Sequence, residues 1–343
     1  MRAHFVALAV VLSACAKPSA PPAPPPAPAP SPQPPAVTAD YVRSTLSALA
    51  DDSMQGRRTA TPGAARAARF IASQFAASHL APLGDSGYFQ KVPLILNAKG
   101  ELDVPASAAD TAGHHSVIDV NVVAVIRGSD PVLKNEVVLV DAHFDHLGVG
   151  KPVNGDSIYN GADDDASGVV TVLAVARALA AGPPPKRTVL FVATTGEELG
   201  LFGTRWLIGH FPVPIDSLRA NLEIEMIGRP DPLTGAGKAW LTGYERTTMG
   251  AEFKAAGLAI FPDPHPEQQF FQRSDNIAYA EMGIPAQTLS SYGLHTDYHA
   301  VTDDMSRVDI QHMTAVISTA IAAVRMLADG PPVTWLPGGK PKD

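Results

Sequence analysis

Short apolar runs alternate with polar segments along this chain, and their spacing predicts both strands and helices. Residues 121–126 and 136–142 are β-branched runs bounded by Gly, Asp or Pro, which is typical of strands. Residues 188–194 form a continuous apolar run, which indicates a strand covered on both faces. Two further apolar runs, 221–227 and 286–290, also predict strands.

Helices are predicted between these strands. Apolar residues at helical spacing over 62–79, with Pro62 at the start, indicate an amphipathic helix. Residues 167–181 are rich in Ala, Val and Leu and long enough for a buried helix, and helices are also expected over 199–208 and 310–327. Strands that alternate with helices in this way predict an α/β fold with a mostly parallel central sheet covered by helices.

The N-terminus has the pattern of an export signal. Residues 1–15 contain a basic start, a short apolar run and small residues before Cys15, which is typical of a signal peptide, and the run is too short to span a bilayer. Residues 12–15 also resemble the bacterial lipoprotein box, in which the cysteine becomes the lipid-bearing N-terminus. A plain signal peptide that happens to contain a cysteine is the alternative. Cys15 is the only cysteine, so the exported protein would form no disulfide of its own.

Composition divides the rest of the chain. Residues 16–38 are rich in Pro and Ala, which predicts an extended, semi-rigid linker, and residues 331–343 are rich in Pro and Gly, which predicts a flexible tail. Residues 39–330 contain no second linker and are expected to form one domain. The net charge of −8 and the absence of basic runs argue against nucleic acid as a partner.

Residue types that bind metals collect where the predicted strands end. His143 follows the strand over 136–142, and Asp145 is placed to orient its ring, because ligating histidines are usually held by a carboxylate. The three neighbouring carboxylates of residues 163–165 precede the long apolar helix. Helix capping accounts for one of them, but three repel one another unless a cation offsets the charge.

Three further segments add acidic groups and a histidine. Glu197 and Glu198 stand after the continuous apolar strand, where one could bind a metal while the other transfers protons; a glutamate pair at a helix start is the plainer alternative. Glu225 lies within an apolar run, where a charge needs a partner, and His299 lies shortly before Asp303. Because such sites lie beyond the carboxyl ends of parallel strands, these segments together predict a two-metal hydrolytic site.

The stretches that hold these residues resemble the signature of the di-zinc aminopeptidase family: AHFDHLG, NGADDDASG, TTGEELGLFGT, IEMIGRP, FFQRSDN and HTDYHAVTDD. The opening of bacterial members resembles LADDSMQGRRT near residue 50. The resemblance covers about residues 40–328. The family includes secreted bacterial and fungal aminopeptidases and the glutamate carboxypeptidases, and the resemblance implies a three-layer αβα fold with helices on both faces of the sheet.

The resemblance implies two Zn²⁺ ions per subunit, held by one set of ligands: His143, Asp164, Glu198, Glu225 and His299. Asp164 would bridge both ions, His143 and Glu225 would complete one, and Glu198 and His299 would complete the other. Two positions depart from the commoner family residues: Glu225, which is usually aspartate, and Asp165, which is usually asparagine.

The resemblance also implies roles for residues around the ions. Glu197 would be the general base, and Tyr298 would stabilise the developing oxyanion. Asp145 and Asp303 would orient the ligating histidines. Three residues would line the substrate pocket: Arg273, Ser274 and Asp275.

These roles imply a zinc-dependent aminopeptidase that hydrolyses N-terminal residues from peptides with a metal-bridged water. The signal predicts export, with a lipid anchor at Cys15 on the periplasmic face of the outer membrane. Carboxypeptidase or dipeptidase specificity on the same site is the nearest alternative. Glutaminyl cyclase-type acyl transfer, which uses one zinc, and a non-catalytic receptor ectodomain are further alternatives, and the full ligand set argues against both.

Overall fold

The computed structural model describes residues 1, 37–97, 99, 101–105 and 115–342. The predicted signal peptide with Cys15, and most of the predicted linker, lie outside the described residues. The elements below all belong to the unit from Gln33 to Asp343.

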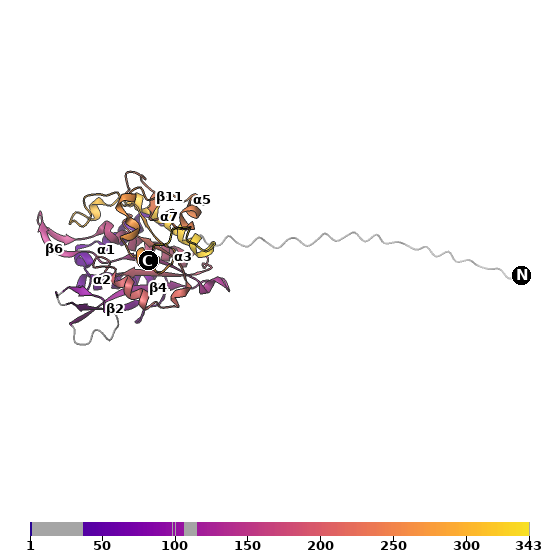
Figure 1. Cartoon of the computed structure of the whole chain (residues 1–343), viewed down its shortest axis with the longest axis horizontal. Helices are drawn as coiled ribbons and strands as arrows, with labels where there is room; N and C mark the ends of the chain where they lie inside the picture. Colours follow the sequence, from indigo (N-terminus) through magenta and orange to yellow (C-terminus); the bar gives the residue numbers. More distant parts are fainter. Residues whose placement is uncertain (2–36, 98, 100, 106–114, 343) are drawn as a thin grey trace. The chain divides into compact units, whose positions relative to one another are not determined.

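A sheet runs through the domain with helices packed around it (Figure 1). The strands at the centre of this sheet are parallel. β5 (Val137–His143) pairs with β8 (Thr188–Thr194) on one side and with β9 (Leu218–Ile224) on the other, and β12 (Ala286–Ser290) pairs with β9. Every residue of β5 and β8 is buried. Burial on both faces explains why these strands are continuous apolar runs in the sequence.

The outer strands make the sheet mixed, so the expected parallel arrangement holds for the centre only. The strand order is β11-β10-β12-β9-β5-β8-β4-β2-β3, and β1 pairs with β4. β4 is antiparallel to β8 and β2, and β10 is antiparallel to β12. The bounds of the outer strands are β1 (Ala81–Pro82), β2 (Phe89–Leu96), β3 (Leu102–Asp103), β4 (Ser116–Ile126), β10 (Ala239–Leu241) and β11 (Ile260–Pro262).

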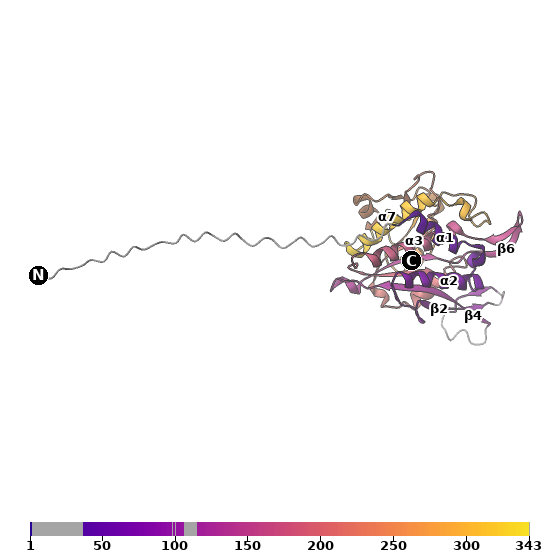
Figure 2. The ribbon, with the colours of Figure 1, turned by 180° about the vertical axis from the view of Figure 1, so that it is seen from behind.

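Helices cover both faces of the sheet, which confirms the predicted three-layer arrangement (Figure 2). One face carries α1 (Ala39–Leu49), α2 (Pro62–Ala77), α3 (Gly168–Ala181) and α7 (Ile310–Asp329). The other face carries α4 (Phe202–Gly209) and α6 (Asn276–Glu281), and α5 (Thr248–Ala255) packs against β11. Short helical turns connect these elements: η1 (Asp52–Arg57), η3 (Leu133–Asn135), η4 (Ala162–Ser167), η5 (Ile215–Ser217), η6 (Pro266–Gln268), η7 (Phe270–Gln272) and η8 (Met305–Arg307).

The apolar core follows from the alternation of side chains along the strands. Val138 and Val140 of β5 belong to the cluster under α1, α2, α3 and α7, whereas Val137 and Leu139 belong to the cluster under α4 and α6. Successive strand residues point to opposite faces, so one apolar strand supplies both cores.

Element boundaries differ from the predictions in two informative places. α4 begins at Phe202 and not at residue 199, because the preceding segment turns through Gly200 and Leu201, which both have positive φ. β9 ends at Ile224, so Glu225 follows the strand and does not lie inside it as predicted. Both differences place acidic residues in loops at the carboxyl end of the sheet.

The C-terminal segment differs from the flexible tail predicted for residues 331–343. The Trp335 Nε1–H donates to the Gly283 carbonyl at 2.8 Å, and the Leu336 N–H donates to the Arg246 carbonyl at 2.8 Å. The Arg246 guanidinium in turn donates to the Gly339 carbonyl at 2.9 Å. The segment up to Gly339 is therefore held on the domain by hydrogen bonds.

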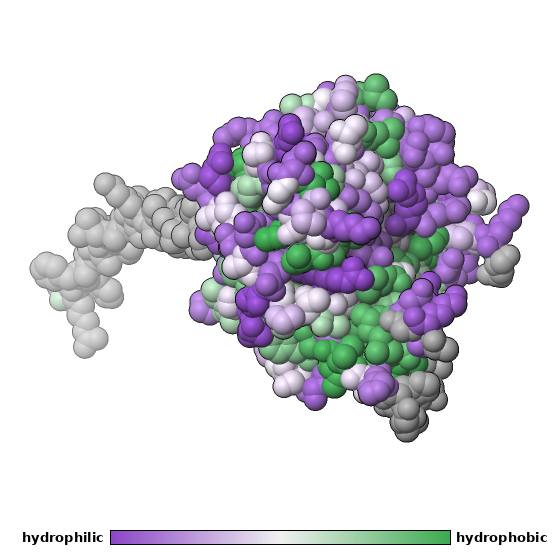
Figure 3. Space-filling view, turned by 90° about the vertical axis from the view of Figure 1, so that its left-hand side faces the viewer, coloured by the Kyte–Doolittle hydropathy of each residue, from purple (hydrophilic) through white to green (hydrophobic). Residues whose placement is uncertain are grey.

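A two-stranded hairpin, β6 (Gly148–Val153) and β7 (Asp156–Tyr159), connects the segment after β5 with η4. The hairpin extends from the sheet in Figure 1, and the face on which it lies is mainly hydrophilic with apolar patches between polar residues (Figure 3). Because it joins two segments that carry predicted ligands, the hairpin borders the candidate site.

A buried arginine holds the loops at the carboxyl end of the sheet. The Arg57 side chain is completely buried. Its Nε donates to the Phe144 carbonyl at 2.7 Å and its Nη2 to the Gly161 carbonyl at 2.9 Å, while Nη1 donates to the carbonyls of Leu49 and Asn160 at 3.0 and 2.5 Å. One side chain thus connects the N-terminal segment to the loops after β5 and before η4.

We expect Arg57→Met to lower the free energy of unfolding by about 3 kcal/mol or more, because each buried carbonyl left without a donor costs ~1–3 kcal/mol. Chemical denaturation measures the change. The exposed neighbour Arg58 donates one bond of 3.3 Å, to the Leu147 carbonyl, and Arg58→Ala serves as the control, with a change within about 0.5 kcal/mol. Equal effects of the two substitutions would contradict this role of Arg57.

Candidate metal centre

The structure brings the five predicted ligands together at the carboxyl end of the sheet. His143 is the last residue of β5, Asp164 lies in η4, and Glu198 follows β8. Glu225 directly follows β9, and His299 lies in the loop after β12. Segments far apart in sequence therefore meet where parallel strands end, as expected for a site in such a sheet.

The ligand atoms form two groups that share Asp164. One group consists of His143, Asp164 and Glu225, and the ligand atoms in each group lie within 4.8 Å of one another. The His143 Nε2 lies 3.3 Å from Asp164 Oδ1, and the His299 Nε2 lies 3.2 Å from Asp164 Oδ2 and 3.1 Å from Glu198 Oε2. The two oxygens of Asp164 thus face different histidines, so this carboxylate stands between the groups.

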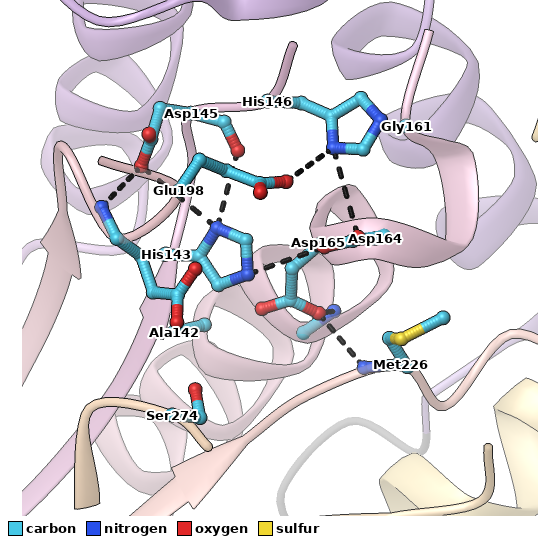
Figure 4. A network of polar contacts seen from close by, with 12 residues as sticks. Ala142, His143, Asp145, His146, Gly161, Asp164, Asp165, Glu198, Met226 and Ser274 are labelled. Carbon is cyan, nitrogen blue, oxygen red and sulfur yellow. Dashed lines mark hydrogen bonds and ion pairs between the residues drawn. The ribbon is translucent and has the colours of Figure 1, made fainter. Parts of the chain in front are cut away.

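The second group contains a residue that the sequence analysis missed, His146. Its Nδ1 lies 2.8 Å from Glu198 Oε1 and 3.7 Å from Asp164 Oδ2 (Figure 4). Its ring meets that of His299 edge to face. The signal that could have found it is its place in AHFDHLG, three residues after His143.

The residues fit a pair of divalent cations. Ligand atoms of a tetrahedral site with bonds of ~2.0–2.1 Å lie about 3.3 Å apart, which agrees with the 3.1–3.3 Å separations among His143, Asp164, Glu198 and His299. The His143 Nε2 is buried, and within the part of the chain that the structure describes it has no hydrogen-bond partner. Imidazole nitrogens with carboxylates are a donor set that suits Zn²⁺.

The carboxylates of the centre have perturbed pKa values. Burial raises the pKa of Glu225 to about 7, against the opposing effect of His143, and burial also raises the pKa of Glu197 well above its ordinary value. Burial would raise the pKa of Asp164 as well, but the imidazoles of His146 and His143 hold it well below its usual range. Negative charge is therefore in excess here, which favours a cation.

The pKa values of the histidines are also shifted by the excess of negative charge. Burial opposes the charged form of His143, yet the carboxylates of Glu197 and Asp164 raise its pKa well above its ordinary value. Burial opposes it at His299 too, but Asp164 and Glu198 raise the pKa of His299 to about 10. Because a ligating imidazole must be neutral, metal binding here would release protons.

Asp145 orients His143 through its backbone. The His143 Nδ1 lies 3.1 Å from the Asp145 carbonyl oxygen but 3.8 Å from the carboxylate, where the expected partner was the side chain. The carbonyl can only accept, so Nδ1 carries the proton and Nε2 is free to bind a metal. The Asp145 carboxylate accepts from the Thr59 hydroxyl at 2.9 Å and from the Glu197 N–H at 3.1 Å.

Asp303 differs from its expected role beside His299. Its carboxylate accepts the backbone N–H groups of Asp163 at 3.0 and 3.1 Å and of Asp164 at 3.0 Å, and it also accepts from the Arg229 guanidinium at 3.3 Å. Asp303 therefore supports the shared carboxylate through the backbone of η4.

A cavity with aromatic walls adjoins the centre. It is lined by Glu225, Met226, Trp240, Thr242, Phe270, Arg273, Thr288, Ser290, Tyr292 and Tyr298. The Tyr298 ring stacks on that of His299, with centroids 3.9 Å apart. Glu225 and Tyr298 thus belong to both the centre and the cavity.

Of the three predicted pocket residues, only Arg273 lines this cavity. Ser274 and Asp275 are buried: the Ser274 hydroxyl donates to Glu223, and Asp275 accepts from the Thr194 hydroxyl at 2.7 Å. Glu223 is a buried carboxylate that the sequence analysis missed. In the strand predicted over 221–227, Glu223 stands two residues before Glu225 and so would share its face, which is the signal that could have indicated it.

Residues 121–324 match Peptidase family M28. This match spans more than half of the chain and includes every segment that supplies the two ligand groups, so the chain belongs to peptidase family M28.

Two curated relatives illustrate the similarity. The probable leucine aminopeptidase 2 of Aspergillus oryzae is 28% identical over 237 residues, which cover 59% of this chain and 43% of that protein. Leupeptin-inactivating enzyme 1 of Streptomyces exfoliatus is 27% identical over 214 residues, which cover 61% of this chain and 44% of that protein. The chain therefore spans less than half the length of these relatives.

Solved structures share the fold at lower identity. An aminopeptidase from Aneurinibacillus sp. strain AM-1 has a TM-score of 0.63 at 16% identity and covers 88% of this chain and 96% of its own. BSAP, a zinc aminopeptidase from Bacillus subtilis, has a TM-score of 0.62 at 15% identity, with 85% and 96% covered. A glutaminyl cyclase from Porphyromonas gingivalis has a TM-score of 0.61 at 17% identity, with 84% and 97% covered. These similarities confirm the predicted fold.

We expect the full-length protein to bind two Zn²⁺ ions per chain in equilibrium dialysis, and His143→Ala to retain one, because His143 belongs to one ligand group only. His265→Asn is the matched control, since this buried ring pairs with Asp231 at 2.8 Å and belongs to neither group. Two ions bound with unchanged affinity by His143→Ala would contradict the assignment.

Proposed function

We propose that the chain is a zinc-dependent aminopeptidase that hydrolyses N-terminal residues from peptides. The observation that carries the proposal is the pair of ligand groups that share Asp164, with an aromatic cavity next to Glu225. Glu197 is close enough to the ligand His143 for its charge to raise the pKa of that histidine. Membership of a peptidase family supports hydrolysis of peptides. The Aspergillus oryzae and Bacillus subtilis proteins are named as aminopeptidases, which supports cleavage at the amino end of the substrate.

The proposed chemistry rests on the residues around the ions. Two Zn²⁺ ions, when bound, supply Lewis acidity that makes water a nucleophile near neutral pH. His143, Asp164 and Glu225 would hold one ion, and Asp164, Glu198 and His299 the other.

Glu197 is the proposed general base. The residue is half-buried, and burial raises the pKa of Glu197 well above its ordinary value, which strengthens the carboxylate as a proton acceptor. Its carboxylate takes a proton from the attacking water and delivers it to the leaving amine. The Asp145 carboxylate accepts the Glu197 N–H at 3.1 Å and so fixes the position of this residue.

Tyr298 is the proposed donor to the oxyanion. Burial raises the pKa of Tyr298, so its hydroxyl keeps its proton and can donate. Trp240, Phe270 and Tyr292 form aromatic walls beside it, which fit an apolar N-terminal side chain.

Arg273 favours a second candidate function. This exposed guanidinium lies 5.0 Å from the centroid of the Phe270 ring at the cavity and could pair with a carboxylate. Recognition of a C-terminal carboxylate would make the enzyme a carboxypeptidase or dipeptidase on the same site.

The proposed location is the cell envelope. The N-terminal pattern supports export, a lipid at Cys15 and the periplasmic face of the outer membrane, and the linker over 16–38 would separate the catalytic domain from the membrane. Lipid chains hold a protein by burial of CH₂ groups in the bilayer.

We expect Glu197→Gln to bind zinc as the wild type does and to lower turnover at least ~100-fold, the usual scale for loss of a general base. The assay compares aminoacyl dipeptides with their N-acetylated counterparts, with and without chelator. Wild-type cleavage of the free-amine peptides only, lost with chelator and restored by zinc, is the result expected for an aminopeptidase.

Other outcomes distinguish the alternatives. Cleavage of blocked peptides with a free C-terminus would favour the carboxypeptidase. Zinc binding without cleavage of either set would direct attention to cyclisation of N-terminal glutamine. Unchanged turnover in Glu197→Gln would remove this residue from the mechanism.

We expect Cys15→Ala to release the protein from membranes of the producing cells, because the lipid would have no attachment site. Sedimentation of membranes followed by detection of the protein in each fraction measures the change. Membrane association that persists in Cys15→Ala would contradict the lipid anchor, and wild-type protein in the soluble fraction would favour the plain signal peptide.

A further inference from the structure

His146 contacts the centre in a way that differs from the other two histidines. Its ring is buried, and its Nδ1 lies 2.8 Å from Glu198 Oε1, a hydrogen-bond distance. The second oxygen of the same carboxylate, Oε2, lies 3.1 Å from the His299 Nε2. The two oxygens of Glu198 therefore face two different imidazoles (Figure 4 shows the contact with His146).

The second ring nitrogen of His146 indicates where its proton lies. Nε2 is buried and has no hydrogen-bond partner among the described residues. A buried N–H without an acceptor costs free energy, so the favoured tautomer carries its proton on Nδ1 and donates it to Glu198 Oε1.

The hydrogen bond from Nδ1 to Glu198, together with the lack of an acceptor at Nε2, indicates that His146 is not itself a metal ligand. Ligating histidines almost always donate their other ring N–H to an acceptor, as the His143 Nδ1 does to the Asp145 carbonyl at 3.1 Å. If His146 bound an ion through Nδ1, its Nε2–H would be left in that position without an acceptor.

We propose that His146 is a positioning residue for the second metal subsite. Its Nδ1–H holds Glu198 Oε1, so that Oε2 is directed to the ion that Asp164 and His299 also bind. The proposal rests on the proposed metal-binding function and adds a determinant of how one ligand is presented.

The surroundings of His146 fix its ring. Gly161 has a positive φ of 57°, and a Cβ at this position would lie 2.6 Å from His146 Cγ, so the loop before η4 leaves room for the imidazole only because a glycine stands there. The ring also meets His299 edge to face, with centroids 5.6 Å apart. A hydrogen bond from a ring held in this way selects one orientation of the Glu198 carboxylate.

The test measures zinc affinity by competition with a chromophoric chelator, in full-length wild type and in His146→Ala, His146→Asn and His265→Asn. We expect His146→Ala to lower the affinity for one of the two Zn²⁺ ions by about 10- to 100-fold, which is the usual effect of losing a side chain that holds a ligand. An asparagine amide can place an N–H near the position of the imidazole Nδ1, so His146→Asn is expected to restore most of the affinity. His265→Asn, the buried control outside both ligand groups, should bind zinc as the wild type does.

Replacing Zn²⁺ with Co²⁺ distinguishes whether His146 positions Glu198 or binds the metal itself. Because His146 is not a ligand in this proposal, the visible absorption of the Co²⁺-loaded His146→Asn protein should match that of the wild type. A changed spectrum, equal losses of affinity in His146→Ala and His146→Asn, or unchanged affinity in His146→Ala would each overturn the proposal. If the wild type itself fails to bind two ions, the proposed function fails first, and that result is distinct from a failure at His146.

Discussion

Burial of negative charge at the carboxyl end of the sheet governs how the loops around the site are arranged. Asp164, Glu198 and Glu225 converge from η4 and from the loops after β8 and β9, and a buried carboxylate is costly unless it is paired. The imidazole nitrogens of His143 and His299 lie within 3.3 Å of carboxylate oxygens of Asp164 and Glu198. This arrangement favours a positive charge between these side chains. A pair of divalent cations would neutralise the negative charge of the carboxylates that the imidazoles leave uncompensated.

A second set of polar contacts lies beneath the ligands and holds them in place. Glu223 is fully buried two residues before Glu225, and it accepts the N–H groups of Asp275 at 3.1 Å and Asn276 at 3.0 Å and the Thr288 hydroxyl at 2.7 Å. Burial raises the pKa of Glu223 to about 8, with Glu225 and Asp275 adding to the effect. Glu223 therefore attaches the start of α6 to β9, next to the residues that form the cavity wall.

The parts of this account that could be predicted from the sequence are those with a local pattern. The apolar runs of β5 and β8 and the acidic segment at Asp164 reveal strands and ligands, because burial and like-charge repulsion act between sequence neighbours. Arg57 could not be assigned in this way, since its partners include the backbone carbonyls of Phe144 and Gly161, which are distant in sequence. The place of His146 in AHFDHLG makes it a candidate, but its contact with Glu198 joins segments 52 residues apart and follows only from the folded structure. Tertiary packing, which no local pattern encodes, also gave Asp303 a partner in the backbone of η4 in place of a histidine.

Anomalous scattering at the zinc edge, from crystals of the zinc-loaded protein, would locate the ions relative to the Asp164 carboxylate. We expect two peaks on either side of the Asp164 carboxylate, one within bonding distance of His143 and Glu225 and the other within bonding distance of Glu198 and His299. A single peak, or two peaks that do not share Asp164, would contradict this expectation.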